Sequence, residues 1–189
     1  MVKSALRVLY KEKRAELKDS QKLKMDDLLL IRFQHLSFEH VLHLLSYWPI
    51  DLHREVNTHI MTQYLNFRIP GLQIAFPVLD PEINSFSALA VNGDTEFKKN
   101  RYGIMEPQDA VPLPAEEIDL IFVPLLCFDS KGYRVGYGKG YYDRYLKTCR
   151  EDAIKVGFSY FDPVELIEDI DDFDVPLNLC ITPNKIYEF

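Results

Sequence analysis

Apolar residues along the chain form helix-spaced stripes and short continuous runs. Near the amino terminus, Leu6, Leu9 and Leu17 recur at a helical spacing with basic residues between them, which predicts an amphipathic helix over 2–17. Further helices are predicted at 20–33, 59–67 and 140–146. Runs bounded by proline, glycine and aspartate predict strands at 41–49, 73–79, 85–91, 118–126, 153–160 and 179–181.

Buried strands that alternate with helices are typical of a sheet covered on both faces. The pattern therefore predicts an α/β protein, an open three-layer α/β/α sandwich with a mostly parallel central sheet. The length of 189 residues fits a single domain over 1–189, because no internal repeat, low-complexity segment or linker interrupts the pattern. In such a sheet, ligands bind beyond the carboxyl ends of the strands.

Composition narrows the class of protein. Hydrophobic residues make up 47% and aromatic residues 13% of the chain, which excludes global disorder. The net charge of -7 disfavours nucleic acid as a partner but allows a local basic pocket for a polyanion. Three cysteines without a Cys-x-x-Cys pair fit a reducing compartment, and the charged amino terminus is unlike a secretory signal. We expect a cytoplasmic monomer that does not bind membranes.

The segment 134–144 carries the clearest chemistry, and its residues 134–140 are called the glycine loop below. Three glycines at every second position allow positive φ angles, so that several N–H groups can point at one anion. Lys139 and Arg134 add positive charge at a loop expected to be reachable by solvent, and the helix that follows adds its positive N-terminus. The predicted phosphate cradle comprises Arg134, Val135, Gly136, Tyr137, Gly138, Lys139, Gly140, Tyr141 and Tyr142. The spacing matches neither a Walker loop nor a dinucleotide fingerprint, and a flexible turn is the alternative.

Other charged residues allow two interpretations each. Lys3 and Arg7 are four residues apart on one helix face, where they form either a solvated stripe or an anion clamp. Glu55 lies near a helix start, either as a dipole partner or as a ligand contact. Six acidic residues fall within 165–174, and Asp174 is the member best placed to be held by its neighbours. The loop 102–107 is a candidate cleft lining, and the histidines form no metal-binding set.

Taken in order, a set of motifs resembles those of the 5-formyltetrahydrofolate cyclo-ligase family, also called methenyltetrahydrofolate synthetase. The motifs are 3–7, 55–58, 102–107, 123–129, 132–143 and Asp174, and they span nearly the whole chain. The glycine block followed by Tyr141-Tyr142-Asp143 is the most specific of them. Two positions depart from the family pattern, since Asn178 stands where many members have Asp and Val135 where Leu is usual.

The resemblance implies an ATP- and Mg²⁺-dependent conversion of 5-formyltetrahydrofolate, with or without a polyglutamate tail, to 5,10-methenyltetrahydrofolate. In the family's mechanism the formyl oxygen attacks the γ-phosphate, and N10 then closes on the phosphorylated intermediate. Lys3 and Arg7 join the glycine loop in binding ATP, while Asp143 and Asp174 hold Mg²⁺. Glu55 is predicted to accept hydrogen bonds from the pterin edge, with Trp48 and Tyr141 as aromatic walls.

Two alternatives stay open on the residues alone. One is a sugar-phosphate isomerase or CoA-transferase relative, because similar α/β sheets serve those chemistries. The other is a non-catalytic protein that binds nucleotide or folate.

Overall fold

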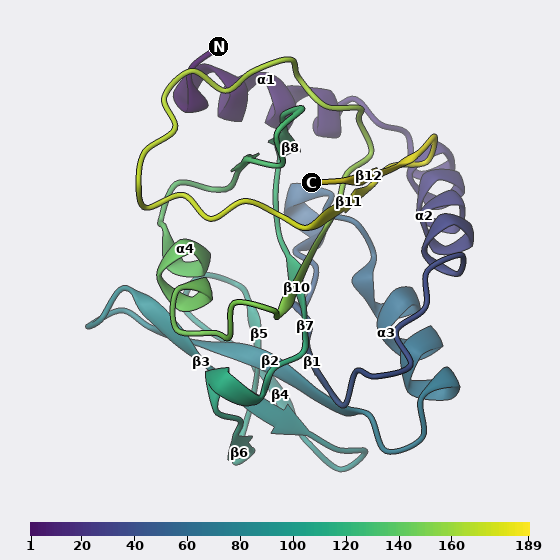
Figure 1. Cartoon of the computed structure of the whole chain (residues 1–189), viewed down its shortest axis with the longest axis vertical. Helices are drawn as coiled ribbons and strands as arrows, with labels where there is room; N and C mark the ends of the chain where they lie inside the picture. Colours follow the sequence, from purple (N-terminus) through teal and green to yellow (C-terminus); the bar gives the residue numbers. More distant parts are fainter.

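The computed structural model describes residues 1–189, and its centre is an eight-stranded sheet in the order β12-β11-β10-β7-β1-β2-β3-β6 (Figure 1). The strands are β1 (His43–Leu45), β2 (Gln73–Asp80), β3 (Ser85–Val91), β6 (Val111–Pro112), β7 (Leu120–Val123), β10 (Ile154–Phe158), β11 (Leu179–Ile181) and β12 (Ile186–Glu188). The central strands β11, β10, β7, β1 and β2 are parallel to one another, and antiparallel strands extend both edges. The predicted α/β class with a mostly parallel sheet is confirmed.

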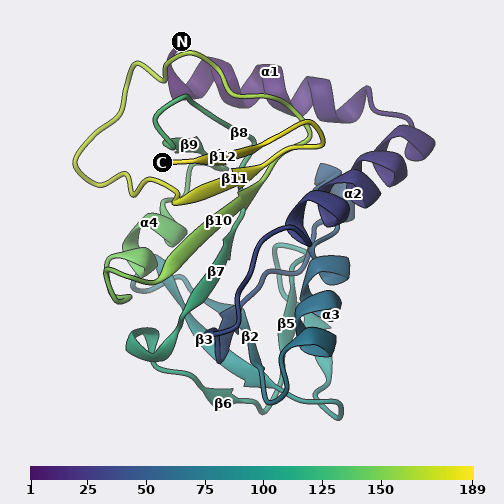
Figure 2. The same cartoon turned by 45° about the vertical axis from the view of Figure 1, so that its right-hand side comes forward.

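Helices cover both faces of the sheet. α2 (Asp19–Phe33) and α3 (Thr58–Arg68) lie on one face, and α4 (Tyr141–Leu146) lies on the other (Figures 1 and 2). α1 (Lys3–Ala15) instead crosses the end of the sheet toward which β7 and β10 run (Figure 2). There it packs on the small hairpin of β8 (Cys127–Phe128) and β9 (Arg134–Val135). This crossing brings the amino terminus to the glycine loop.

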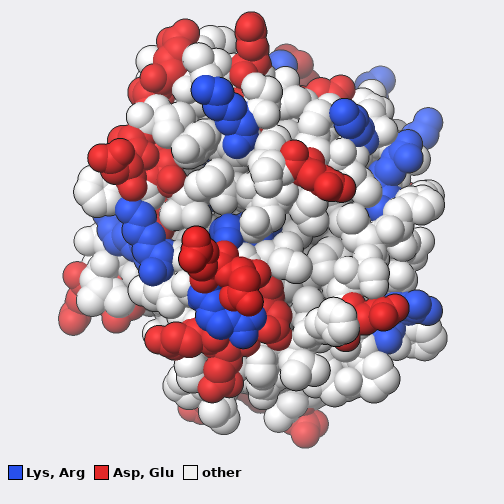
Figure 3. All heavy atoms as spheres, in the orientation of Figure 1, with Lys and Arg blue, Asp and Glu red and all other residues white.

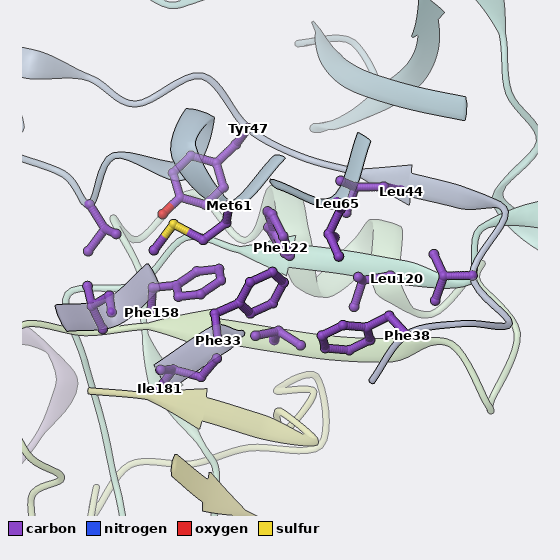
Figure 4. Packing of buried hydrophobic residues seen from close by; sticks show 14 of the residues in the cluster. Phe33, Phe38, Leu44, Tyr47, Met61, Leu65, Leu120, Phe122, Phe158 and Ile181 are labelled. Carbon is purple, nitrogen blue, oxygen red and sulfur yellow. The ribbon is translucent and has the colours of Figure 1, made fainter. Parts of the chain in front are cut away.

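The apolar run that forms the central strand β7 is continuous because the side chains on both of its faces are buried. Leu120 and Phe122 pack with Phe33 of α2 on one face, in the cluster shown in Figure 4. Ile121 and Val123 pack on the opposite face, in the cluster that also holds residues of α4. All four side chains of β7 are fully buried because both faces of the sheet are covered.

Several predicted elements are shorter than expected. The strand expected over 41–49 spans only His43–Leu45, and two residues beyond it the Tyr47 carbonyl accepts a hydrogen bond from Thr58 Oγ1 at 2.8 Å. The strand expected over 118–126 ends at Val123. The short elements β4 (Phe97–Lys99), β5 (Met105–Pro107), β6, β8, β9, β12, η1 (Asp51–His53) and η2 (Ala115–Glu117) were not predicted. Segments of two or three residues are too short to show a period.

The outer surface carries charges of both signs. On the face shown in Figure 3, basic and acidic side chains are interspersed, and one acidic group surrounds a basic side chain in the lower half. None of the helices combines the length with the apolar composition that a bilayer span requires.

Candidate active site

A cavity of about 680 Å³ opens at the carboxyl edge of β1, β2 and β7. Tyr47 and Trp48 follow β1 directly, Pro124 follows β7, and Leu79 belongs to β2. The glycine loop, α1 and the segment 171–174 form the remaining walls. The cavity thus lies where an open parallel sheet places its ligands.

The cavity concentrates positive charge in an acidic protein. Its lining holds seven Lys and Arg residues against four Asp and Glu residues, whereas the whole chain has a net charge of -7. The basic residues are Lys3, Arg7, Lys11, Arg134, Lys139, Arg144 and Lys147, and the acidic ones are Glu55, Asp143, Asp171 and Asp174. Clustered cations in a concave site attract anionic ligands.

Two of the three glycines in the loop are required by its geometry. Gly138 and Gly140 have φ angles of +92° and +69°, which side chains rarely adopt, whereas Gly136 does not have a positive φ. A Cβ on Gly138 would lie 3.2 Å from Arg7 Nε. The conformational freedom of glycine is therefore used at 138 and 140 but not at Gly136, and the close approach of Arg7 adds a second reason for glycine at 138.

Lys3 and Arg7 share a face of α1, and both line the cavity. Arg7 Nε donates to the Gly136 carbonyl at 3.0 Å, and Lys3 Nζ lies 2.5 Å from Asp174 Oδ2. The Lys3 side chain is only 13% exposed, so the solvated-stripe interpretation is wrong for it. The pair joins the amino-terminal helix to both the glycine loop and the acidic segment.

The two cations predicted in the glycine loop have different surroundings. Lys139 is exposed and makes no ion pair. Arg134 is buried, and its guanidinium donates to Asp143 Oδ1 at 2.9 Å and to the Val175 carbonyl at 2.5 Å. The expectation that solvent reaches both side chains is wrong for Arg134, whose partners come from α4 and from the segment before β11.

Asp143 and Asp174 both line the cavity, and each already accepts from a cation. Asp143 uses Oδ1 for Arg134 and the Val175 N–H, and Asp174 uses Oδ2 for Lys3. The second oxygen of each carboxylate accepts no hydrogen bond within the chain. No cluster of three or more His, Cys, Asp or Glu side chains forms a ready-made metal cage. The two carboxylates fit a Mg²⁺ ion that takes most of its ligands from phosphate and water.

Glu55 is 3% exposed in a loop before α3, and it lines the cavity. Its Oε2 accepts from the Ile50 N–H at 2.7 Å. The helix begins three residues later, at Thr58, and the hydrogen bond that the carboxylate accepts comes from Ile50 and not from the first turn of α3. A buried carboxylate that opens into a cavity is available to a ligand.

Aromatic side chains line the same cavity as Glu55. Trp48 packs with its ring centroid 4.5 Å from His59 and 4.7 Å from Phe97. Tyr141, the first residue of α4, also lines the cavity. The three residues predicted to contact a flat substrate therefore share one cavity with the glycine loop.

Other lining residues were missed or misplaced by the sequence reasoning. Lys11 continues the face of Lys3 and Arg7 one turn further, so its spacing was a usable signal. Phe173 lies under Lys147, with Nζ 4.6 Å from the ring centroid, and no local pattern indicates this pair. The full set of unpredicted lining residues is Lys11, Tyr47, Ile50, His53, Pro77, Leu79, Pro124, Arg144, Lys147, Asp171 and Phe173; Tyr102 and Ile104 lie in the loop named as a candidate lining.

The two departures from the family pattern lie outside the cavity lining. Val135, although placed in the predicted cradle, is fully buried and packs with Leu6 behind the loop. Asn178 Oδ1 accepts from the Lys155 N–H at 2.8 Å, beside β10 and β11. Neither side chain therefore reaches a ligand in the cavity directly.

The fold and the cavity together define a class, that of open-sheet α/β proteins with an anion-binding glycine loop at the carboxyl edge. Within this class, residues 1–183 match the model of the 5-formyltetrahydrofolate cyclo-ligase family. The chain belongs to this family. The resemblance noted in the motifs is thereby confirmed.

Relatives and solved structures agree with the family match. The 5-formyltetrahydrofolate cyclo-ligase of Haemophilus influenzae is 36% identical over 129 residues, covering 65% of this chain and 67% of that protein. The Mycoplasma genitalium cyclo-ligase is 30% identical over 183 residues, covering 94% and 97%. The structure of Aquifex aeolicus 5,10-methenyltetrahydrofolate synthetase superimposes with a TM-score of 0.83 at 28% identity, covering 100% of this chain and 93% of that one. The protein is thus an enzyme of the cyclo-ligase class, which excludes the isomerase or transferase alternative.

Proposed function

We propose that the protein uses ATP and Mg²⁺ to convert 5-formyltetrahydrofolate to 5,10-methenyltetrahydrofolate, releasing ADP and phosphate. One observation carries this proposal: a single cavity is lined both by the glycine loop with its cations and by Glu55, Trp48 and Tyr141. A phosphate donor and a flat folate ring can meet there. Family membership supplies the reaction class.

The chemistry needs activation of a formyl oxygen. This oxygen is a poor leaving group as hydroxide, so it first attacks the γ-phosphorus of ATP while the bond to the ADP oxygen breaks. N10 then attacks the formyl carbon and loses its proton, and the carbon–oxygen bond breaks as inorganic phosphate leaves. Phosphoryl transfer asks the protein mainly for positioning and for neutralisation of charge.

The residues around the glycine loop suit that task. Backbone N–H groups near Gly138 and Gly140 would bind phosphate oxygens, and Lys139 is a cation with no competing partner. Lys3 and Arg7 reach the same loop from α1. Asp143 and Asp174 would hold Mg²⁺, which when bound neutralises charge on the phosphate oxygens.

Glu55 and two aromatic residues of the same cavity suit a reduced pterin. Adjacent N–H and amino donors along one ring edge match the two oxygens of the buried Glu55 carboxylate. Trp48 and Tyr141 offer aromatic faces to the ring. The formyl group would then share the cavity with a phosphate bound at the glycine loop.

The test is a spectrophotometric assay of methenyltetrahydrofolate formation with purified protein, with and without ATP and Mg²⁺. We expect product only with both, and one ADP per product in a single turnover. A protein that binds folate and nucleotide but forms neither product nor ADP would fit the non-catalytic alternative and refute the proposal. Substrates with one and with several glutamates, assayed side by side, measure tolerance of a polyglutamate tail.

A further inference from the structure

Arg14, on α1, is a buried cation without a carboxylate partner. Arg14 is 2% exposed, and its guanidinium makes no ion pair. Nη2 donates to the Leu125 carbonyl, Nη1 donates to the Tyr137 hydroxyl at 3.2 Å, and Nε has no partner. A buried guanidinium with so few acceptors is costly unless opposite charge is near.

Glu55 is a matching buried anion. It is 3% exposed, and no cation lies within ion-pair distance of its carboxylate. The Tyr137 side chain lies near both charges, because its hydroxyl accepts from Arg14 Nη1 at 3.2 Å and the residue lines the same cavity as Glu55. Burial first, and then the Glu55 charge, raises the pKa of Tyr137, so its hydroxyl keeps the proton.

The Tyr137 ring is held from two sides. It stacks on His53 of η1, with ring centroids 5.0 Å apart and an interplanar angle of 26°. Its backbone lies between Gly136, whose carbonyl accepts from Arg7, and Gly138, which needs a positive φ. Any ligand that orders the glycine loop therefore orders this ring.

We propose that Tyr137 is a positioning residue that links the glycine loop to Glu55. Arg14 donates to the Tyr137 hydroxyl. This hydroxyl, which stays protonated, donates a hydrogen bond to the Glu55 carboxylate and so holds the carboxylate toward the folate. Nucleotide in the loop then tightens folate binding, and folate tightens nucleotide binding by the same factor. The proposal rests on the proposed function of the cavity.

The test uses Tyr137→Phe, which removes only the hydroxyl. Affinity for 5-formyltetrahydrofolate is measured by calorimetry with and without saturating ADP. In the wild type we expect ADP to tighten folate binding by about fivefold or more, the lower range of measured couplings. In the variant this factor should fall to about one.

Tyr145→Phe is the matched control. The Tyr145 hydroxyl is also buried but has no hydrogen-bond partner, and it does not line the cavity. Its removal should leave the coupling at the wild-type value. In a Glu55→Gln background, Tyr137→Phe should add no further loss of folate affinity, because the acceptor that it serves is already changed.

The proposal is overturned if ADP tightens folate binding in Tyr137→Phe by the same factor as in the wild type. It is also overturned if the wild-type enzyme is active but ADP does not change its affinity for folate. Equal loss of both ligands in Tyr137→Phe would also overturn it, since that result describes damage to the loop. Failure of the proposed function is a separate result, because the wild type would then form no methenyl product at all.

Discussion

Arg134→Ala and Lys139→Ala, made as two single variants, should distinguish a cation that stabilises the fold from a cation that binds the ligand in the same loop. The Arg134 side chain is 4% exposed, and its removal leaves Asp143 Oδ1 and the Val175 carbonyl without a charged donor. Breaking a fully buried ion pair costs about 3–5 kcal/mol. The Asp143 side chain is 25% exposed and can regain water, so we expect a smaller loss of about 2–3 kcal/mol in the free energy of unfolding.

That loss corresponds to a fall in Tm of about 4–12 °C, since 1 kcal/mol shifts Tm by about 2–4 °C in a chain of this size. Lys139 has no partner, so Lys139→Ala should change stability by less than about 0.5 kcal/mol. Loss of a charge-assisted phosphate contact, about 1.5–3 kcal/mol, should raise its KM for ATP by about 10- to 100-fold.

The assays are thermal unfolding followed by circular dichroism and initial rates at varied ATP. Lys131→Ala is the control, because Lys131 is exposed just before the same loop but outside the cavity lining. If Arg134→Ala unfolds at the wild-type temperature, the buried network is not a source of stability. If Lys139→Ala keeps the wild-type KM for ATP, the phosphate-cradle interpretation is refuted.

Four further substitutions test single features. Asp143→Asn should raise the Mg²⁺ concentration for half-maximal rate, and a titration like that of the parent would contradict the metal assignment. Glu55→Gln should raise the folate KM by about tenfold or more at an unchanged ATP KM, because an amide donor then faces a donor edge; equal effects on both would restrict Glu55 to a structural role. Gly138→Ala should raise the ATP KM and lower Tm, because residue 138 has a φ of +92° and the new Cβ would lie 3.2 Å from Arg7 Nε. Unchanged values would show that the loop relaxes freely. Leu6→Ala removes a fully buried side chain and should destabilise by about 3–5 kcal/mol in denaturant unfolding; less than about 1 kcal/mol would mean that α1 is only loosely docked.

Local patterns were sufficient for much of the fold. Helix α2 was expected over 20–33 and is observed over Asp19–Phe33. The prediction is within one residue because a helix of this length is long enough for its spacing of apolar residues to be recognised. Strands β3 and β11 have the expected bounds. The predicted strand at 41–49 was too long because Tyr47 and Trp48 are as apolar as strand residues, and the hydrogen bond from Thr58 on α3 to the Tyr47 carbonyl is a contact that a local pattern does not show.

The candidate site was predictable in its residue types but not in its pairings. The alternating glycines and the spacing of Lys3 and Arg7 are local facts, and the structure brings them to one cavity. Arg134 and Lys139 were equivalent as cations in the sequence, yet the first is buried against Asp143 and the second is exposed. Nothing near Arg134 in the chain indicates that difference.

The sequence by itself determined the α/β class, most of the helices and strands, and the residue types that can bind phosphate, because these depend on neighbours within one or two turns. The tertiary structure alone decided which charges are buried and which partners they meet. The contact of Arg14 with Tyr137 joins residues 123 positions apart, and that of Lys3 with Asp174 joins residues 171 apart. Such contacts arise from the packing of α1 and the segment before β11 at the sheet edge, and a local pattern carries no record of that packing.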